Sequence, residues 1–205
     1  LSISKSTLSG WLSNLVISDK AREKIQSRAY KKSTEALIRR NKKQTESAII
    51  RKLETRKLAK REVGTISRRD LFLLGVAIYW AEGYKRPVVR DGRELTWHAV
   101  SLTNSDPYIV KTFLRFLREC CMVSEHKIKA SIRIFQHQNE NVLLKFWQKE
   151  TNIMATNFHK TYYGVSKSSL GKRPFNQLPH GVIQIVVADT ILFHRIMGYI
   201  EGIKK

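Results

Sequence analysis

The chain has 205 residues, of which 38 are lysine or arginine and 17 are aspartate or glutamate, so its formal net charge is +21. This length allows one medium-sized domain and an appendage. A hydrophobic content of 42% excludes a basic tail that is disordered throughout. So large a positive charge on such a chain argues for a polyanionic partner, most simply nucleic acid.

The cysteines and the apolar runs indicate the compartment of the protein and whether it spans a membrane. The two cysteines, Cys120 and Cys121, are adjacent. Neighbouring cysteines neither staple a fold nor supply a zinc tetrahedron, which predicts an intracellular protein without a structural zinc site. We recognise no signal peptide, and no apolar run reaches the roughly 18 residues of a membrane-spanning helix. We therefore expect a cytoplasmic, nucleoid-associated protein with no membrane partner.

Residues 1–17 begin with LSISKSTLSGWLSN, in which Ser4 can cap a helix. Leu8, Trp11 and Leu12 recur at helical spacing on its inner side. The outer side carries short polar or cationic side chains that suit contacts with phosphates and base edges, namely Lys5, Ser6, Thr7 and Ser9. This stretch resembles the turn and recognition helix of helix-turn-helix proteins. The resemblance implies a partial DNA-reading module, and the alternative is an ordinary amphipathic first helix.

Residues 18–66 form a basic linker. Sixteen lysine or arginine residues and six acidic residues lie between positions 18 and 63, with a broken apolar stripe and no proline or glycine. This pattern predicts one or two long helices, ending near Gly64 and Thr65. Such a charge run is either a solvated helix face or a surface that follows a phosphate backbone.

The most informative stretch is Leu71 to Lys85, LFLLGVAIYWAEGYK. It is almost entirely apolar up to Ala81, and the next residue, Glu82, is its single carboxylate. The Ser-x-x-Asp signature at residues 67–70 predicts a helix that begins near Arg68, and Gly83 suits its C-cap. Small residues at positions 75, 77 and 81 would let a second helix approach closely.

The rest of the chain alternates strand and helix signals. Asp91-Gly92 predicts a hairpin turn between strands at 87–90 and 94–104. Helices are expected from Asp106-Pro107 to about Cys121, over residues 141–150, and after a cap at Asp189 or Thr190. Further strands are expected at 128–135, where Ile128, Ala130, Ile132 and Ile134 face a core, and at 158–164 and 182–188.

These elements predict an α+β domain over residues 67–205, with an antiparallel sheet and helices gathered on one face. The other face would be polar and cationic, with Lys129, Arg133, Lys160 and Gln184 as candidate DNA contacts. Lys172 and Arg173 join them from a basic loop before the last strand.

The helix ending Ala81-Glu82-Gly83 resembles the signature helix of the LAGLIDADG homing endonucleases. Ala77 stands where that family usually has glycine, Trp80 differs from the usual residue, and the helix at 141–150 departs from the commonest order. The resemblance implies a sheet laid over the DNA major groove and a homodimer through the 71–83 helix. It also implies that Glu82 and the carbonyl of Ala81 hold Mg²⁺ or a similar divalent cation, which makes Glu82 the catalytic residue.

Two functions from different classes follow from this resemblance. The first is a sequence-specific double-stranded DNA-binding protein that cuts DNA as a metal-dependent, homodimeric homing-type endonuclease. The alternative is a transcription regulator that binds DNA without cutting it, because WhiA-type regulators combine a LAGLIDADG-like domain with a helix-turn-helix. The chain retains Glu82, which favours the enzyme. His137 and Asn139 only faintly resemble an HNH nuclease, since its partner histidine and metal-binding hairpin are missing.

Overall fold

The computed structural model describes residues 3–86, 88–164 and 178–204. The chain divides into two units, residues 1–64 and 65–205. The predicted contacts Lys172 and Arg173 lie outside the described residues.

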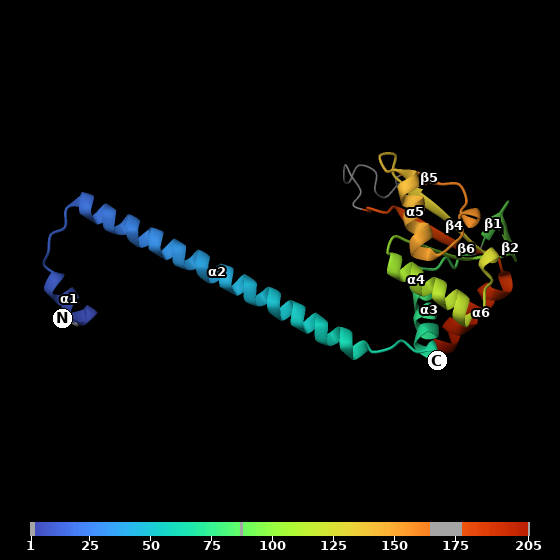
Figure 1. Ribbon diagram of the computed structural model, residues 1–205, viewed down its shortest axis with the longest axis horizontal. Coiled ribbons are helices and arrows are strands. Elements are labelled where there is room, and N and C mark those ends of the chain that lie inside the picture. Colours follow the sequence, from blue (N-terminus) through green and yellow to red (C-terminus); the bar gives the residue numbers. More distant parts are fainter. Residues whose placement is uncertain (1–2, 87, 165–177, 205) are drawn as a thin grey trace. The chain divides into compact units, whose positions relative to one another are not determined.

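The first unit is helical and buries none of its described side chains. Helix α1 spans Lys5–Leu12, and the Ser4 side chain accepts a hydrogen bond from the Thr7 N–H, as a cap does. Helix α2 spans Asp19–Val63 without interruption, so its 45 residues are about 67 Å long (Figure 1). The linker is therefore one helix, and it ends at Gly64, whose φ of 63° favours glycine.

The second unit combines four α-helices with two sheets among its described residues. Its helical elements are α3 (Arg68–Glu82), α4 (Pro107–Arg115), the π-helical turn η1 (Phe116–Cys120), α5 (Glu140–Thr151) and α6 (Thr190–Ile203), with short 3-10 turns η2 (Glu125–Lys127) and η3 (Ala155–Asn157). The expected caps are present. Ser67 and Asp70 form a reciprocal capping box on α3, and hydrogen bonds from Ser67 lower the pKa of Asp70. Asp106 caps α4, and Asp189 caps α6.

The main sheet has the order β3-β6-β4-β5, formed by Val100–Asn104, Val182–Val187, Ile128–Ile134 and Tyr162–Tyr163. Strand β6 pairs antiparallel with both β3 and β4, but β5 pairs parallel with β4. The expectation of a wholly antiparallel sheet is therefore wrong. Helix α5 and η3 lie between β4 and β5 in the chain, and such a crossover returns the strand in its original direction.

Two predicted strands are shorter than expected. The hairpin of β1 (Val88–Arg90) and β2 (Arg93–Leu95) forms a separate two-stranded sheet, and the chain leaves strand geometry before β3. At this break the Thr190 hydroxyl accepts from the His98 N–H and donates to the His98 carbonyl, each at 3.1 Å, so His98 is not paired with a strand there. Within residues 158–164 only Tyr162–Tyr163 is a strand, preceded by one bridge between Phe158 and Ala130.

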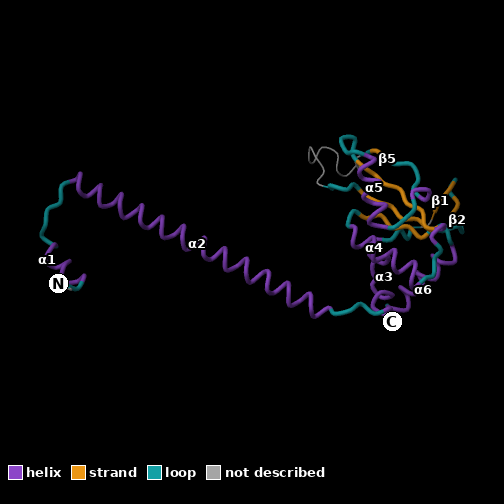
Figure 2. The backbone as a smooth tube through the Cα atoms, viewed as in Figure 1, coloured by secondary structure: helices purple, strands orange, loops and turns teal. Residues whose placement is uncertain are grey.

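One face of the main sheet packs into the core. Val100, Ile128 and Val187 form one buried row across three strands, and Leu102, Ala130 and Ile185 form the next. These rows pack in one cluster with side chains from all four helices of the unit, including Val76, Phe113, Trp147 and Ile196. Helices α3, α4 and α6 lie together on one side of the strands in Figure 2. The domain is thus α+β with one helix-covered sheet face and one open face.

Candidate nucleic-acid interface and metal site

The end of α3 lies against the edge of the main sheet. Gly83 forms an antiparallel bridge with Leu102, and the Tyr84 N–H donates to the Ser101 carbonyl at 2.9 Å. A Cβ atom on Gly83 would lie 2.4 Å from the Tyr79 ring, so only glycine fits this turn. Its extended φ of −70° shows that close contact, and not a left-handed cap, requires the glycine. Glu82 is exposed at this corner.

Tyr79 and Lys85 fix the geometry of the corner. Burial raises the pKa of Tyr79 to about 12, and its hydroxyl donates to the Tyr84 carbonyl at 2.9 Å. The Lys85 ammonium donates to the carbonyls of Gly83 at 2.6 Å and Tyr79 at 3.3 Å. A cation at this place offsets the partial negative charge of the helix C-terminus. Lys85 was not among the predicted site residues, although a lysine just after a helix end is a known capping signal.

The residues at this corner fit a divalent cation only in part. Carbonyls in the last turn of a helix, such as those of Trp80 and Ala81, lie where no further helical turn follows to supply N–H donors. The Tyr84 N–H, which would serve the Trp80 carbonyl in a longer helix, donates to the Ser101 carbonyl instead. Glu82 is a carboxylate next to that carbonyl. Among the described residues no cluster of three or more Asp, Glu, His or Cys side chains occurs. One carboxylate is enough for Mg²⁺ where substrate phosphates and water complete its coordination.

The open face of the sheet brings together three of the predicted DNA contacts. Ser101, Val186 and Lys129 form one cross-strand row, and Thr103, Gln184 and Ser131 form the next. Arg133 follows, opposite Val182, and is exposed like Gln184. Lys160 is exposed between the Phe158 bridge and β5, so it lies at the β5 edge and not within a strand. The face is hollowed by about 390 Å³ beside Arg133, Gln184 and Tyr162.

Two of these polar side chains are held in place by neighbours. The Lys129 ammonium donates to the Asn157 carboxamide oxygen at 2.7 Å, and Asn157 donates in turn to the Glu125 carbonyl. The Gln184 amide donates to the Ser101 hydroxyl at 3.0 Å. Gln184 keeps its carboxamide oxygen and a second N–H for other partners. The arrangement offers donors and acceptors at fixed places on a cationic face.

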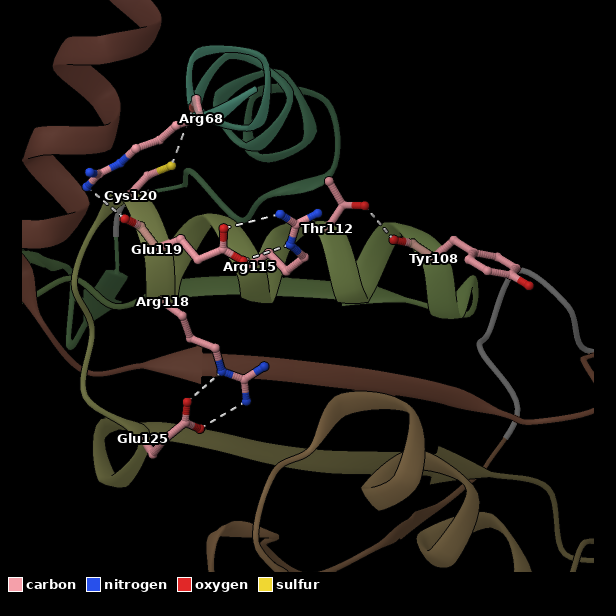
Figure 3. Close-up of polar contacts among 8 residues, drawn as sticks. All are labelled: Arg68, Tyr108, Thr112, Arg115, Arg118, Glu119, Cys120 and Glu125. Carbon is pink, nitrogen blue, oxygen red and sulfur yellow. Dashed lines mark hydrogen bonds and ion pairs between the residues drawn. The ribbon is translucent and has the colours of Figure 1, made fainter. Parts of the chain in front are cut away.

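Several cations of the helix layer differ from those of the open face, because carboxylates already neutralise them. Arg115 pairs with Glu119, and Arg118 forms a two-pronged pair with Glu125 (Figure 3). The other ion pairs of the described residues are Lys111–Glu150 and Lys127–Asp189. None of these pairs uses a cation of α2 or of the open face. The cations of α2 and of the open face therefore keep their full charge.

The predicted reader residues lie on α1. Lys5, Ser6, Thr7 and Ser9 are all exposed. The hydroxyls of Ser6 and Thr7 lie 2.7 Å and 2.8 Å from the Ser4 hydroxyl, so they take part in the cap. Trp11 remains 67% exposed, and no buried core forms beneath α1.

The signature helix keeps one apolar stripe uncovered. Leu74, Ala77 and Ala81 are exposed on it, beside Trp80. Gly75 is buried, and a Cβ atom there would meet the Phe116 ring at 2.0 Å. The close helix approach expected at Gly75 is thus made by η1 of the same chain.

The comparisons with known proteins give no match: neither a known protein family, nor a curated protein, nor a solved structure resembles the chain closely enough to register. Among the described helices none has both the length and the apolar character needed to cross a membrane.

Proposed function

We propose that the protein binds double-stranded DNA sequence-specifically and cuts it as a homodimeric endonuclease that depends on a divalent cation. The observation that carries the proposal is the exposed Glu82 at the end of α3, beside a polar, cationic sheet face. A nuclease needs its acidic metal ligand next to the surface that holds the phosphates, because the metal stabilises charge on the oxygens of the scissile phosphate. The resemblance of Ala81-Glu82-Gly83 to the LAGLIDADG motif supports the same assignment.

In this proposal the metal, when bound, polarises the scissile phosphate and activates water. Glu82 and the Ala81 carbonyl would hold the metal. Lys85 fixes the backbone of the corner, and Arg133 and Gln184 contact DNA across the sheet.

The uncovered stripe of α3 supports the homodimer. Each chain offers one Glu82, and two strands of DNA need two metal sites. A two-fold contact through Leu74, Ala77 and Ala81 would bring two Glu82 corners side by side, since a two-fold interface uses the same patch on both copies. The small side chains of Ala77 and Ala81 allow the helix backbones to approach.

A plasmid library with a randomised insert tests the proposal. The wild type, Glu82→Gln and the control Glu201→Gln are incubated with it in Mg²⁺ or in EDTA, and linear and nicked products are measured. Glu201 is an exposed glutamate near the end of α6, so it matches Glu82 in chemistry and place in a helix. We expect metal-dependent cuts with the wild type and Glu201→Gln, and at least about 100-fold fewer cuts with Glu82→Gln. Removing one group that stabilises charge in a transition state typically lowers the rate by about this factor.

Cuts that persist with Glu82→Gln, or in EDTA, contradict the assigned metal ligand. DNA binding without cuts, equal for all three proteins, contradicts the nuclease and leaves the regulator that binds DNA without cutting it.

A further inference from the structure

A second hollow, of about 240 Å³, lies where the hairpin side of the domain meets the open face. We call it the Trp97 pocket. Its lining is aromatic and polar, and includes Tyr84, Arg86, Trp97, His98, Ser101 and Gln184. Among the described residues, no carboxylate lines it. Tyr84 is only two residues beyond Glu82, so the pocket adjoins the corner to which the proposed function assigns the metal.

The walls of this pocket are fixed by backbone hydrogen bonds. The Tyr84 N–H donates to the Ser101 carbonyl, and the Tyr84 carbonyl accepts from the Tyr79 hydroxyl. The Thr190 side chain holds both the N–H and the carbonyl of His98. The His98 ring stacks on the Phe193 ring at 4.6 Å with an interplanar angle of 10°. The pocket is therefore preformed, which lowers the entropic cost of binding a ligand.

The chemistry of the lining selects a flat, hydrogen-bonding ring attached to an anion. Trp97 and Tyr84 are each 52% exposed and offer ring faces for stacking. The Ser101 residue is 8% exposed, and its hydroxyl meets the Gln184 amide at 3.0 Å, which supplies donors and acceptors for a ring edge. Arg86 supplies a cation at the same place. The volume is smaller than the roughly 300 Å³ where pockets for drug-sized ligands begin, so a single ring system suits it.

We propose that the Trp97 pocket binds one unpaired nucleobase, turned out of the DNA duplex beside the scissile phosphate that a metal at Glu82 would contact. A base within a duplex has both of its faces covered by its neighbours, so only an extruded base can stack on protein rings. Extrusion costs least where the base is already unpaired. This inference rests on the proposed DNA-binding function and adds to it a preference for duplexes with a locally unpaired nucleotide next to the cut.

Fluorescence anisotropy with two duplexes tests the inference on the full chain. One duplex is perfectly paired, and the other has the same sequence with a single bulged adenine. We expect the wild type to bind the bulged duplex at least about fivefold more tightly, the lower end of the effect of stacking one base on an aromatic side chain. Trp97→Ala brings the ratio of the two affinities close to one, whereas Trp97→Phe retains most of it. Tyr84→Ala lowers the ratio independently, and circular dichroism verifies that each variant is folded.

The control variant is Tyr108→Ala, because Tyr108 is a solvent-facing aromatic residue on α4, 77% exposed and outside the pocket. It leaves the ratio unchanged. A wild type that binds both duplexes equally overturns the pocket inference and leaves the proposed function standing. A wild type that binds neither overturns both. Displacement of the bulged duplex by micromolar free dAMP would assign the pocket to a free nucleotide, and would also overturn the inference.

Discussion

The two units of the chain carry nearly the same charge but are built in opposite ways. Residues 1–64 hold seventeen lysine or arginine residues and six acidic ones, and residues 65–205 hold twenty-one and eleven. The first unit buries none of its described side chains, whereas the second encloses a contiguous apolar core. Helix α2 therefore depends on local propensity and its caps, and isolated helices are only marginally stable in water. The two units thus carry a similar net charge on different supports. In residues 65–205 the charge lies on a packed domain, whereas in residues 1–64 it lies on helices that a bound polyanion would stabilise.

A pair of tryptophans gives the largest expected difference between the units. Trp147 is fully buried, and its indole N–H donates to the His180 carbonyl at 2.8 Å, while Trp11 is 67% exposed. We expect Trp147→Ala to lower the free energy of unfolding by about 3–5 kcal/mol, because it leaves a cavity and an unpaired carbonyl. Trp11→Ala changes it by about 0.5 kcal/mol or less. Urea unfolding followed by near-ultraviolet circular dichroism measures both, and equal losses would contradict the comparison.

Two glycines, one in each unit, provide a second test of this difference, with a smaller expected change in stability than the tryptophans. Glycine to alanine inside a helix normally stabilises by about 0.5–1 kcal/mol. At Gly10 of α1 a new Cβ meets nothing within 4 Å, so Gly10→Ala should raise helicity in the first unit. At Gly75 the Cβ would lie 2.0 Å from Phe116, so Gly75→Ala should destabilise the second unit by about 1–3 kcal/mol. Thermal unfolding of both variants measures these changes in stability. If Gly75→Ala were more stable than the wild type, η1 would have to be able to move away from α3.

The features that the sequence predicted correctly are those that depend on neighbouring residues. Caps at Ser4, Ser67 and Asp106 were confirmed, because a cap depends on side chains within a few residues of it. The Asp91-Gly92 hairpin was confirmed for the same reason, since both residues take the positive φ that their types tolerate.

Two errors in the predicted sheet depend on residues that are distant in the sequence. The strand expected through His98 is interrupted by Thr190, which lies 92 positions later. The parallel pairing of β5 follows from a crossover that strand periodicity does not reveal. For the candidate site, the pattern predicted Glu82 at the end of a helix and Lys129, Arg133 and Gln184 on the open face, and the structure places them there. Lys85 and the Trp97 pocket were not, because tertiary contacts create them.

Alkaline pH should affect the packed unit through Tyr79. Burial raises the pKa of Tyr79 from 10.0 to about 12, so the unfolded chain loses this proton before the folded chain does. Stability is therefore fully present below pH 10 and falls between pH 10 and about 12, by up to about 1.4 kcal/mol per pH unit. Tyr79→Phe should cost about 1 kcal/mol at pH 7, through the lost bond to the Tyr84 carbonyl, and should lose less stability than the wild type above pH 10.

Urea midpoints of both proteins at pH 7, 9, 10 and 11 test this. The buried Cys121, whose pKa burial also raises to about 12, titrates in both proteins and so cancels in the difference. Parallel curves for the two proteins would contradict the assignment of the alkaline loss to Tyr79.

The smallest expected effect separates free cations from paired ones in DNA binding. Lys42 and Lys43 are exposed on α2, whereas Arg115 and Arg118 are held by Glu119 and Glu125. Each phosphate contact contributes about 0.9 to the slope of log affinity against log salt, because binding releases condensed counterions. We expect Lys42→Gln with Lys43→Gln to reduce the slope by about one to two.

The double change Arg115→Gln with Arg118→Gln removes the same charge from the chain and is the matched control. It should leave the slope unchanged, because carboxylates already neutralise these side chains. Anisotropy titrations of one duplex at several salt concentrations measure both slopes. A wild-type slope near zero would contradict DNA binding itself, since a chain of this charge cannot neutralise phosphates without releasing ions. Equal reductions in the two double variants would instead mean that overall charge, and not the placement of free cations, determines affinity.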